Sequence, residues 1–86
     1  MKKKIAILGS TGSIGKNFIN IIKKDKKNIE IILIVVKKNI KELLKQLKLF
    51  KVKNIIVTDH EKFLQLKKIL KKKKINIYND FNSINK

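Results

Sequence analysis

Apolar and polar residues alternate along this chain with two different periods, and the change of period predicts its secondary structure. Three stretches are almost continuously aliphatic, which is typical of strands buried in a parallel sheet: Lys3–Leu8, Glu30–Val36 and Asn54–Thr58. A shorter apolar stretch, Ile75–Tyr78, predicts a fourth strand. Each strand is followed by a segment of a different pattern, so the strands do not form hairpins.

Between the strands, apolar residues recur every three or four positions, as they do on one face of a helix. The first helix is predicted over Ser13–Lys24 and is followed by a polar turn, Asp25–Asn28. Its expected buried face consists of Ile14, Phe18, Ile21 and Ile22.

Two further helices are predicted from capping residues and apolar spacing. Asn39 is expected to cap a helix that runs through Phe50, and Asp59 a third helix. Asp80 is a candidate start for another helix. The expected buried faces are Ile40, Leu43, Leu44 and Leu47 in the second helix and Phe63, Leu66, Ile69 and Leu70 in the third.

The order β-α-β-α-β-α-β predicts an α/β fold, a Rossmann-like open parallel sheet with right-handed crossovers. The chain has 86 residues, no proline and no linker-like stretch, so we expect one domain with a modest core.

The net charge of +17 would ordinarily suggest a nucleic-acid or membrane partner. All 23 basic residues are lysine, however, and isoleucine and asparagine are also abundant. These three residues share A/T-rich codons, so one compositional bias accounts for all of them. Proteins that bind nucleic acid at a dedicated site usually contact it with arginine and with stacking aromatic residues. We therefore expect a solvated lysine surface with weak, salt-sensitive affinity for nucleic acid and no specific site.

The chain has no cysteine, which excludes disulfides and thiolate metal sites and fits a cytoplasmic protein. No signal peptide is recognisable at the N-terminus. The longest apolar run, Ile31–Val36, is far shorter than the roughly 20 residues that span a bilayer. We expect no membrane partner.

The three glycines of the chain, Gly9, Gly12 and Gly15, lie between the first predicted strand and the first predicted helix. A nucleoside-triphosphate P-loop would need glycine where Ser10 stands and a hydroxyl residue where Asn17 stands. The spacing G-x-x-G-x-x-G instead resembles the dinucleotide-binding fingerprint, whose strand–turn–helix context is also present. The alternative is that the glycines only form a tight turn.

The fingerprint assigns a role to each part of the loop. Gly9 allows a sharp turn, Gly12 a close approach to a pyrophosphate, and Gly15 close packing of the helix. The amides of Thr11 to Ile14 lie at a helix N-terminus, which favours anions, and the hydroxyls of Thr11 and Ser13 can add hydrogen bonds.

The residues after the second predicted strand indicate which dinucleotide binds. NAD-binding folds usually place a carboxylate there to hold the ribose 2′-hydroxyl. This chain has Lys37, Lys38 and Asn39 instead. Lysine would accept a 2′-phosphate, so NADPH is the expected cofactor.

The stretch ILGSTGSIG, the aliphatic second strand and the Lys38-Asn39 pair resemble the start of 1-deoxy-D-xylulose 5-phosphate reductoisomerases. The resemblance implies an oxidoreductase and isomerase of non-mevalonate isoprenoid biosynthesis. Such enzymes use NADPH with Mg²⁺ or Mn²⁺ and convert a sugar phosphate to 2-C-methyl-D-erythritol 4-phosphate as homodimers of much longer chains.

Within the resemblance, cofactor contacts are implied for Thr11, Gly12, Ser13, Ile14, Lys38 and Asn39. The family generally has glycine where this chain has Lys37. A glycine with positive φ, or one that the adenosine approaches closely, would make Lys37 unfavourable for affinity.

The resemblance implies that residues 1–86 are an N-terminal NADPH-binding segment that holds only the first half of the cofactor fold. Asp59-His60-Glu61 is the only compact acidic cluster, and Asp59 is better explained as a helix cap. We therefore expect no catalytic residue and no metal ligand here, no turnover by this chain alone, and an exposed edge on the first strand.

Two alternatives remain open. One is a segment of another NAD(P)-dependent oxidoreductase, although a short-chain dehydrogenase would need lysine where Asn82 follows Tyr78. The other is a non-catalytic basic α/β module that binds anions or nucleic acid through lysine.

Overall fold

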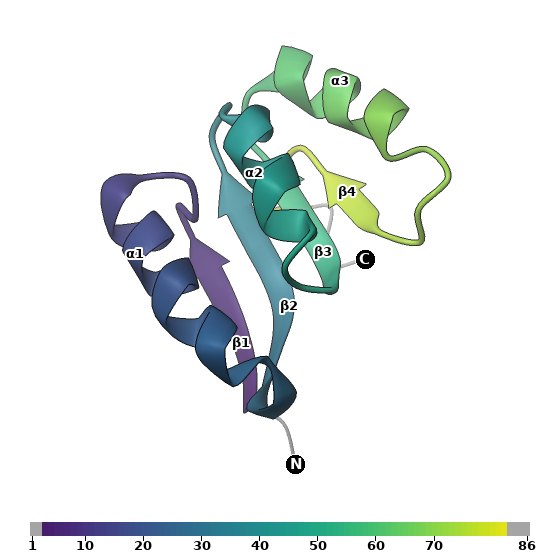
Figure 1. The fold of residues 1–86 in the computed structure, drawn as a ribbon. Helices are drawn as coiled ribbons and strands as arrows, with labels where there is room; N and C mark the ends of the chain where they lie inside the picture. Colours follow the sequence, from purple (N-terminus) through teal and green to yellow (C-terminus); the bar gives the residue numbers. More distant parts are fainter. Residues whose placement is uncertain (1–2, 83–86) are drawn as a thin grey trace.

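A computed structural model describes residues 3–82 as four strands that alternate with helices (Figure 1). The strands are β1 (Lys3–Leu8), β2 (Ile29–Val36), β3 (Val52–Val57) and β4 (Asn76–Tyr78). The helices are α1 (Ser13–Ile22), α2 (Ile40–Leu47) and α3 (His60–Ile69), and η1 (Lys23–Asn28) is a 3₁₀ helix after α1. All four strands predicted from the sequence are present. No helix in the described residues is long and apolar enough to cross a membrane.

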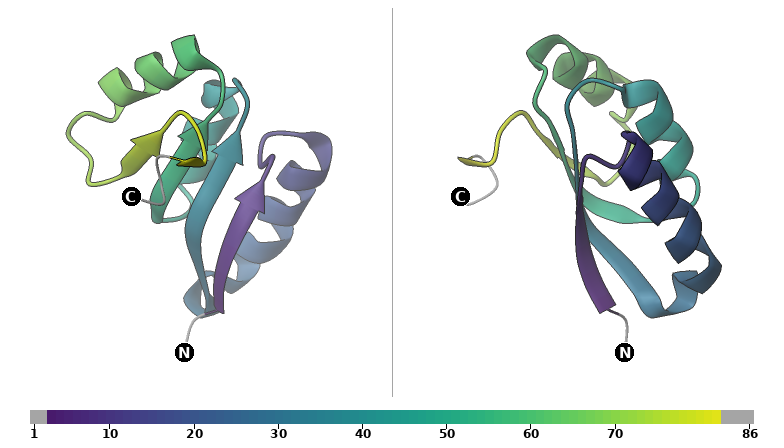
Figure 2. Two further views of the ribbon diagram at one scale, coloured as in Figure 1. Left: turned by 180° about the vertical axis from the view of Figure 1, so that it is seen from behind. Right: turned by 90° about the vertical axis from the view of Figure 1, so that its left-hand side faces the viewer.

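The strands form one parallel sheet in the order β1-β2-β3-β4. Every crossover therefore moves in the same direction, and right-handed crossovers then place all the helices on one face. Figure 2 shows this arrangement in its right-hand view, with α1, α2 and α3 on the same side of the sheet. The predicted open parallel α/β sheet is confirmed. So is the free edge of the first strand, because no described strand pairs with the outer side of β1.

The core lies between the sheet and its helices. Ile34 and Ile55 from neighbouring strands are fully buried, as are Leu43 of α2 and Leu66 of α3. The pairing of β1 with β2 contains one register shift, since Ile5 pairs with Ile31 whereas Ala6 pairs with Leu33. The remaining core members are Ile7, Ile19, Ile22, Ile31, Val36, Ile40, Phe50, Val52, Val57 and Leu70.

Two helices end earlier than the sequence pattern predicts. Helix α1 ends at Ile22, and the segment predicted as a turn belongs to η1, in which Asp25 departs from helical geometry (φ −127°, ψ 37°). Helix α2 ends at Leu47 and not at Phe50. The N–H groups of Leu49 and Phe50 bond back to the carbonyl of Gln46, which forms a turn and brings Phe50 into the core.

The predicted caps of α2 and α3 are confirmed. Asn39 Oδ1 accepts a hydrogen bond from the N–H of Glu42 at 3.1 Å, and Asp59 Oδ2 accepts one from the N–H of Lys62 at 3.1 Å. A helix continuing from Asp80 would extend over residues 83–86, which lie outside the described residues.

The predicted buried face of α1 is wrong except for Ile22. Ile14 is 86% exposed and Ile21 is 67% exposed, whereas Ile19 is only 2% exposed. The helix instead buries Gly15, Ile19 and Ile22, which have the same spacing as the predicted stripe. Gly15 explains the choice, because the face with the smallest residue lets the helix come closest to the neighbouring backbone.

We predict that Ile19→Ala and Ile21→Ala differ sharply in stability. Ile19→Ala leaves a cavity in the core and should lower the free energy of unfolding by about 2–5 kcal/mol. Ile21→Ala removes an exposed side chain and should change it by less than about 0.5 kcal/mol. Urea unfolding followed by circular dichroism measures both. Equal losses would mean that α1 packs through the face that we describe as exposed.

Candidate functional site

The candidate site begins where β1 ends, at a turn that requires glycine. Gly9 has a φ of +75°, in the left-handed region that side chains disfavour. Its N–H donates to the carbonyl of Val35 at 2.7 Å, which ties the turn to β2. The predicted role of Gly9 in a sharp turn is confirmed.

Gly15 is required for a different reason, the close packing of α1 on this turn. A Cβ at this position would lie 2.1 Å from the carbonyl oxygen of Gly9 and 2.7 Å from Cα of Ser10. Both atoms are backbone atoms and cannot move aside as a flexible side chain could. The glycine thus sets the distance between the helix and the turn.

Neither reason applies to Gly12. Its φ is −77°, and a Cβ there would meet only the carbonyl oxygen of Gly9, at 3.6 Å, an ordinary contact. Gly12 is exposed at the N-cap of α1. No steric contact in the described residues therefore requires a glycine at this position.

The N-terminus of α1 differs from those of the other two helices. No side chain caps it and no acidic residue lies in its first turn, whereas α2 and α3 have both features. The first N–H groups of a helix have no intrahelical acceptor, and the helix dipole makes this end positive. The end of α1 next to Gly12 is therefore suited to an anion.

A hollow of about 600 Å³ lies beside this helix end. Its lining includes three exposed apolar residues, Leu8, Ile14 and Phe18, together with Ala6, Gly12 and Ser13. The hollow thus lies between the uncapped end of α1 and exposed apolar side chains of β1 and α1.

The segment Lys37 to Asn39 lies at the same end of the sheet as the glycine turn, because both follow the carboxyl ends of neighbouring strands and Gly9 is bonded to Val35 of β2. All three residues are exposed, and Asn39 Oδ1 is occupied as the cap of α2. No non-glycine residue in residues 3–82 has a positive φ. Lys37 therefore causes no backbone strain where the family generally has glycine.

The acidic cluster after β3 does not form a metal site in the described structure. The Asp59 carboxylate caps α3, and the His60 ring lies 3.5 Å from the Asn79 side-chain oxygen. Residues 3–82 contain no group of three or more His, Cys, Asp or Glu residues that could hold a metal ion.

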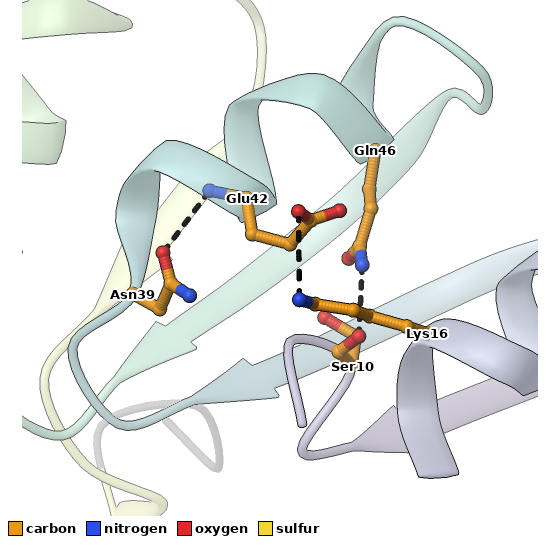
Figure 3. A network of polar contacts seen from close by, with 5 residues as sticks. All are labelled: Ser10, Lys16, Asn39, Glu42 and Gln46. Atoms are coloured by element: carbon orange, nitrogen blue, oxygen red, sulfur yellow. Dashed lines mark hydrogen bonds and ion pairs between the residues drawn. The ribbon is translucent and has the colours of Figure 1, made fainter. Parts of the chain in front are cut away.

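Ser10 and Gln46 are buried polar residues beside the glycine turn that were not predicted from the sequence as part of the site (Figure 3). Gln46 Nε2 donates to the Ser10 carbonyl at 2.8 Å across 36 positions of sequence. One feature of the sequence could have indicated that Gln46 is buried: it follows Leu43 by three positions and so lies on the buried side of a leucine-rich helix.

Comparisons with known proteins agree with this geometry. The family model for 1-deoxy-D-xylulose 5-phosphate reductoisomerase matches residues 5–85. Curated enzymes of that name match from Pelagibacter ubique, at 57% identity over 98% of this chain, and from Thermoanaerobacter sp. strain X514, at 43% over 81%. This chain covers 22% and 18% of those two proteins, so it spans about a fifth of their length.

A solved structure shares the fold. The 1-deoxy-D-xylulose 5-phosphate reductoisomerase from Zymomonas mobilis, in complex with NADPH, matches with a TM-score of 0.83 at 23% identity. The match covers 91% of this chain and 21% of that one.

We predict that alanine destabilises the protein more at Gly15 than at Gly12. Gly15→Ala should lower the free energy of unfolding by about 1–3 kcal/mol, the usual range for overpacking, although alanine is the better helix former. Gly12→Ala should cost less than about 1 kcal/mol, because its Cβ has room. Chemical denaturation tests both, and a stable Gly15→Ala variant would contradict the close contact between α1 and the turn.

Proposed function

Because the chain belongs to the 1-deoxy-D-xylulose 5-phosphate reductoisomerase family, we propose that it forms the NADPH-binding part of such an enzyme. The whole enzyme rearranges and reduces 1-deoxy-D-xylulose 5-phosphate to 2-C-methyl-D-erythritol 4-phosphate with NADPH and Mg²⁺ or Mn²⁺, in non-mevalonate isoprenoid biosynthesis. When bound, NADPH supplies the hydride. The residues of this chain bind and orient the cofactor.

The pyrophosphate of the cofactor binds at the glycine turn. The amides of Thr11, Ser13 and Ile14 at the uncapped end of α1 donate to it, and the hydroxyls of Thr11 and Ser13 add hydrogen bonds. The Gly12 N–H donates to the Gly9 carbonyl at 3.1 Å, so Gly12 contributes chiefly by its missing side chain. The observation that carries this proposal is Gly12, whose missing side chain the fold does not need. A Cβ at this exposed position would stand where the pyrophosphate approaches.

The adenosine end binds beside the end of β2. The exposed Lys37 and Lys38 provide positive charge for a 2′-phosphate, and Asn39 can donate from its amide nitrogen while its oxygen caps α2. No carboxylate stands between Val36 and Asn39 to hold a free 2′-hydroxyl. The segment thus favours NADPH over NADH.

The rest of the enzyme lies in a further part of a longer chain. Two observations support this: the chain spans about a fifth of its relatives, and it exposes apolar residues beside the free edge of β1. A second half of the sheet would pair with β1 and cover Leu8, Ile14, Phe18 and Ile21. The metal ligands, the sugar-phosphate site and the homodimer contacts belong to that part. Residues 1–86 are then inactive alone, and the enzyme is cytoplasmic.

We predict that this chain binds NADPH at least tenfold more tightly than NADH. The double variant Lys37→Ala/Lys38→Ala should lose about tenfold or more in NADPH affinity while its affinity for NADH changes little. A hydrogen bond to a charged group contributes about 1.5–3 kcal/mol, and 1.4 kcal/mol corresponds to tenfold. Fluorescence titration of the reduced nicotinamide measures both affinities.

The matched control is Lys72→Ala/Lys73→Ala, which removes the same charge from the lysine-rich segment after α3. It should leave the preference for NADPH unchanged. A DNA duplex titrated at low and high salt tests the alternative of a basic anion-binding module. Duplex binding that is tighter than NADPH binding and equally weakened by both lysine pairs would contradict the proposed function.

A further inference from the structure

We propose that Gln46 is a positioning residue that holds the glycine turn in its NADPH-binding geometry. The inference rests on the proposed function and extends it to a residue that does not border the hollow beside the turn. Gln46 lies in α2, and its side chain reaches the turn that precedes α1 (Figure 3).

The contact is buried on both sides. Gln46 is 2% exposed and Ser10 is 0% exposed, and the Nε2 to carbonyl-oxygen distance is 2.8 Å. A buried carbonyl that loses its donor costs more free energy than the bond contributes when formed, because water cannot replace the donor. The Ser10 carbonyl is therefore held firmly toward α2.

The direction of this carbonyl controls a group that faces the cofactor. The carbonyl of Ser10 and the N–H of Thr11 belong to one planar trans peptide and point in opposite directions. Because Gln46 holds the carbonyl toward α2, the N–H of Thr11 points away from α2. Thr11 is the first of the residues proposed to donate to the pyrophosphate.

Gln46 satisfies the Ser10 carbonyl but leaves an oxygen of its own unpaired. Gln46 Oε1 and Ser10 Oγ are buried without a hydrogen-bond partner in the described structure. A leucine at position 46 would suit the apolar side of α2 and would bury no unsatisfied oxygen of its own. It would, however, leave the buried Ser10 carbonyl without a donor, so what the glutamine supplies at this position is a hydrogen bond to that one carbonyl.

The other contact between these elements is much weaker. Lys16 Nζ lies 4.0 Å from Glu42 Oε1, and the Lys16 side chain is 48% exposed. Solvent and salt screen such a pair. Of these two polar contacts, the buried one made by Gln46 is the stronger link between the glycine turn and α2, whose N-cap is Asn39.

The test measures Gln46→Leu with two ligands, NADPH and adenosine 2′-phosphate. Adenosine 2′-phosphate has no pyrophosphate and reports only on the adenosine end. We expect NADPH affinity to fall by about tenfold, the equivalent of about 1.4 kcal/mol, and adenosine 2′-phosphate affinity to change by less than about twofold. Leu43→Val, which trims a buried neighbour on α2, is the control for general loosening and should leave the ratio of the two affinities unchanged.

A second variant, Gln46→Glu, keeps the shape but removes the donor when the carboxyl is ionised. Protonation restores an O–H donor, and burial favours the protonated form. Its affinity for NADP⁺, relative to wild type at the same pH, should therefore recover by several-fold as the pH falls from about 8 to about 5. A purely structural role for Gln46 would not produce this recovery together with unchanged binding of adenosine 2′-phosphate.

The outcomes separate the two proposals. Wild-type protein that does not bind NADPH overturns the proposed function and the role of Gln46 with it. If wild type binds NADPH but folded Gln46→Leu keeps its full affinity, or loses affinity equally for both ligands, only the positioning role is wrong. Circular dichroism establishes which variants are folded, and the Gln46→Glu variant provides the test if Gln46→Leu does not fold.

Discussion

The structure depends on the close packing of α1 against the backbone of the turn that follows β1. At Gly15 no side-chain atom separates the helix from Gly9 and Ser10. This contact determines the direction in which α1 leaves the sheet, and hence where its unpaired amides point. The same turn is fixed from the other side by the bond between Gly9 and Val35 and by the amide of Gln46. An anion at this place meets donors that are already oriented, so little ordering is needed on binding.

The N-termini of the three helices differ in how their first amides are satisfied and in the charge nearby. Helices α2 and α3 begin with a capping side chain and an acidic residue, which satisfy their own amides and repel anions. Helix α1 begins with neither. A lysine-rich chain attracts anions over much of its surface, but among the helices of residues 3–82 only this end combines the lack of a side-chain cap, a missing Cβ at Gly12 and an adjoining hollow. Local geometry thus selects the site within a positive field that is not itself selective.

The sequence predicted the strands and the glycine turn well, because aliphatic runs and scarce glycines are local signals. It also predicted the caps at Asn39 and Asp59, whose side chains bond to the amide three positions later. The prediction of the buried face of α1 was wrong. The predicted residues and the residues that are buried recur at the same spacing, and Gly15, which has no side chain, does not mark the buried face by its hydrophobicity. Gln46 was not predicted because a bond that spans 36 positions leaves no trace in periodicity. The residues proposed to contact the cofactor follow the carboxyl ends of β1 and β2, but only the tertiary contacts distinguish which glycines the fold requires.

The central claim is that the pyrophosphate of NADPH binds to the amides at the start of α1. Amide chemical-shift mapping by ¹H–¹⁵N NMR during titration with NADPH tests it most directly. The account predicts that the largest shifts occur at Thr11, Gly12, Ser13 and Ile14, with a second group at Lys38 and Asn39. Shifts spread evenly over the lysine-rich segments, with none concentrated at the glycine turn, would contradict it.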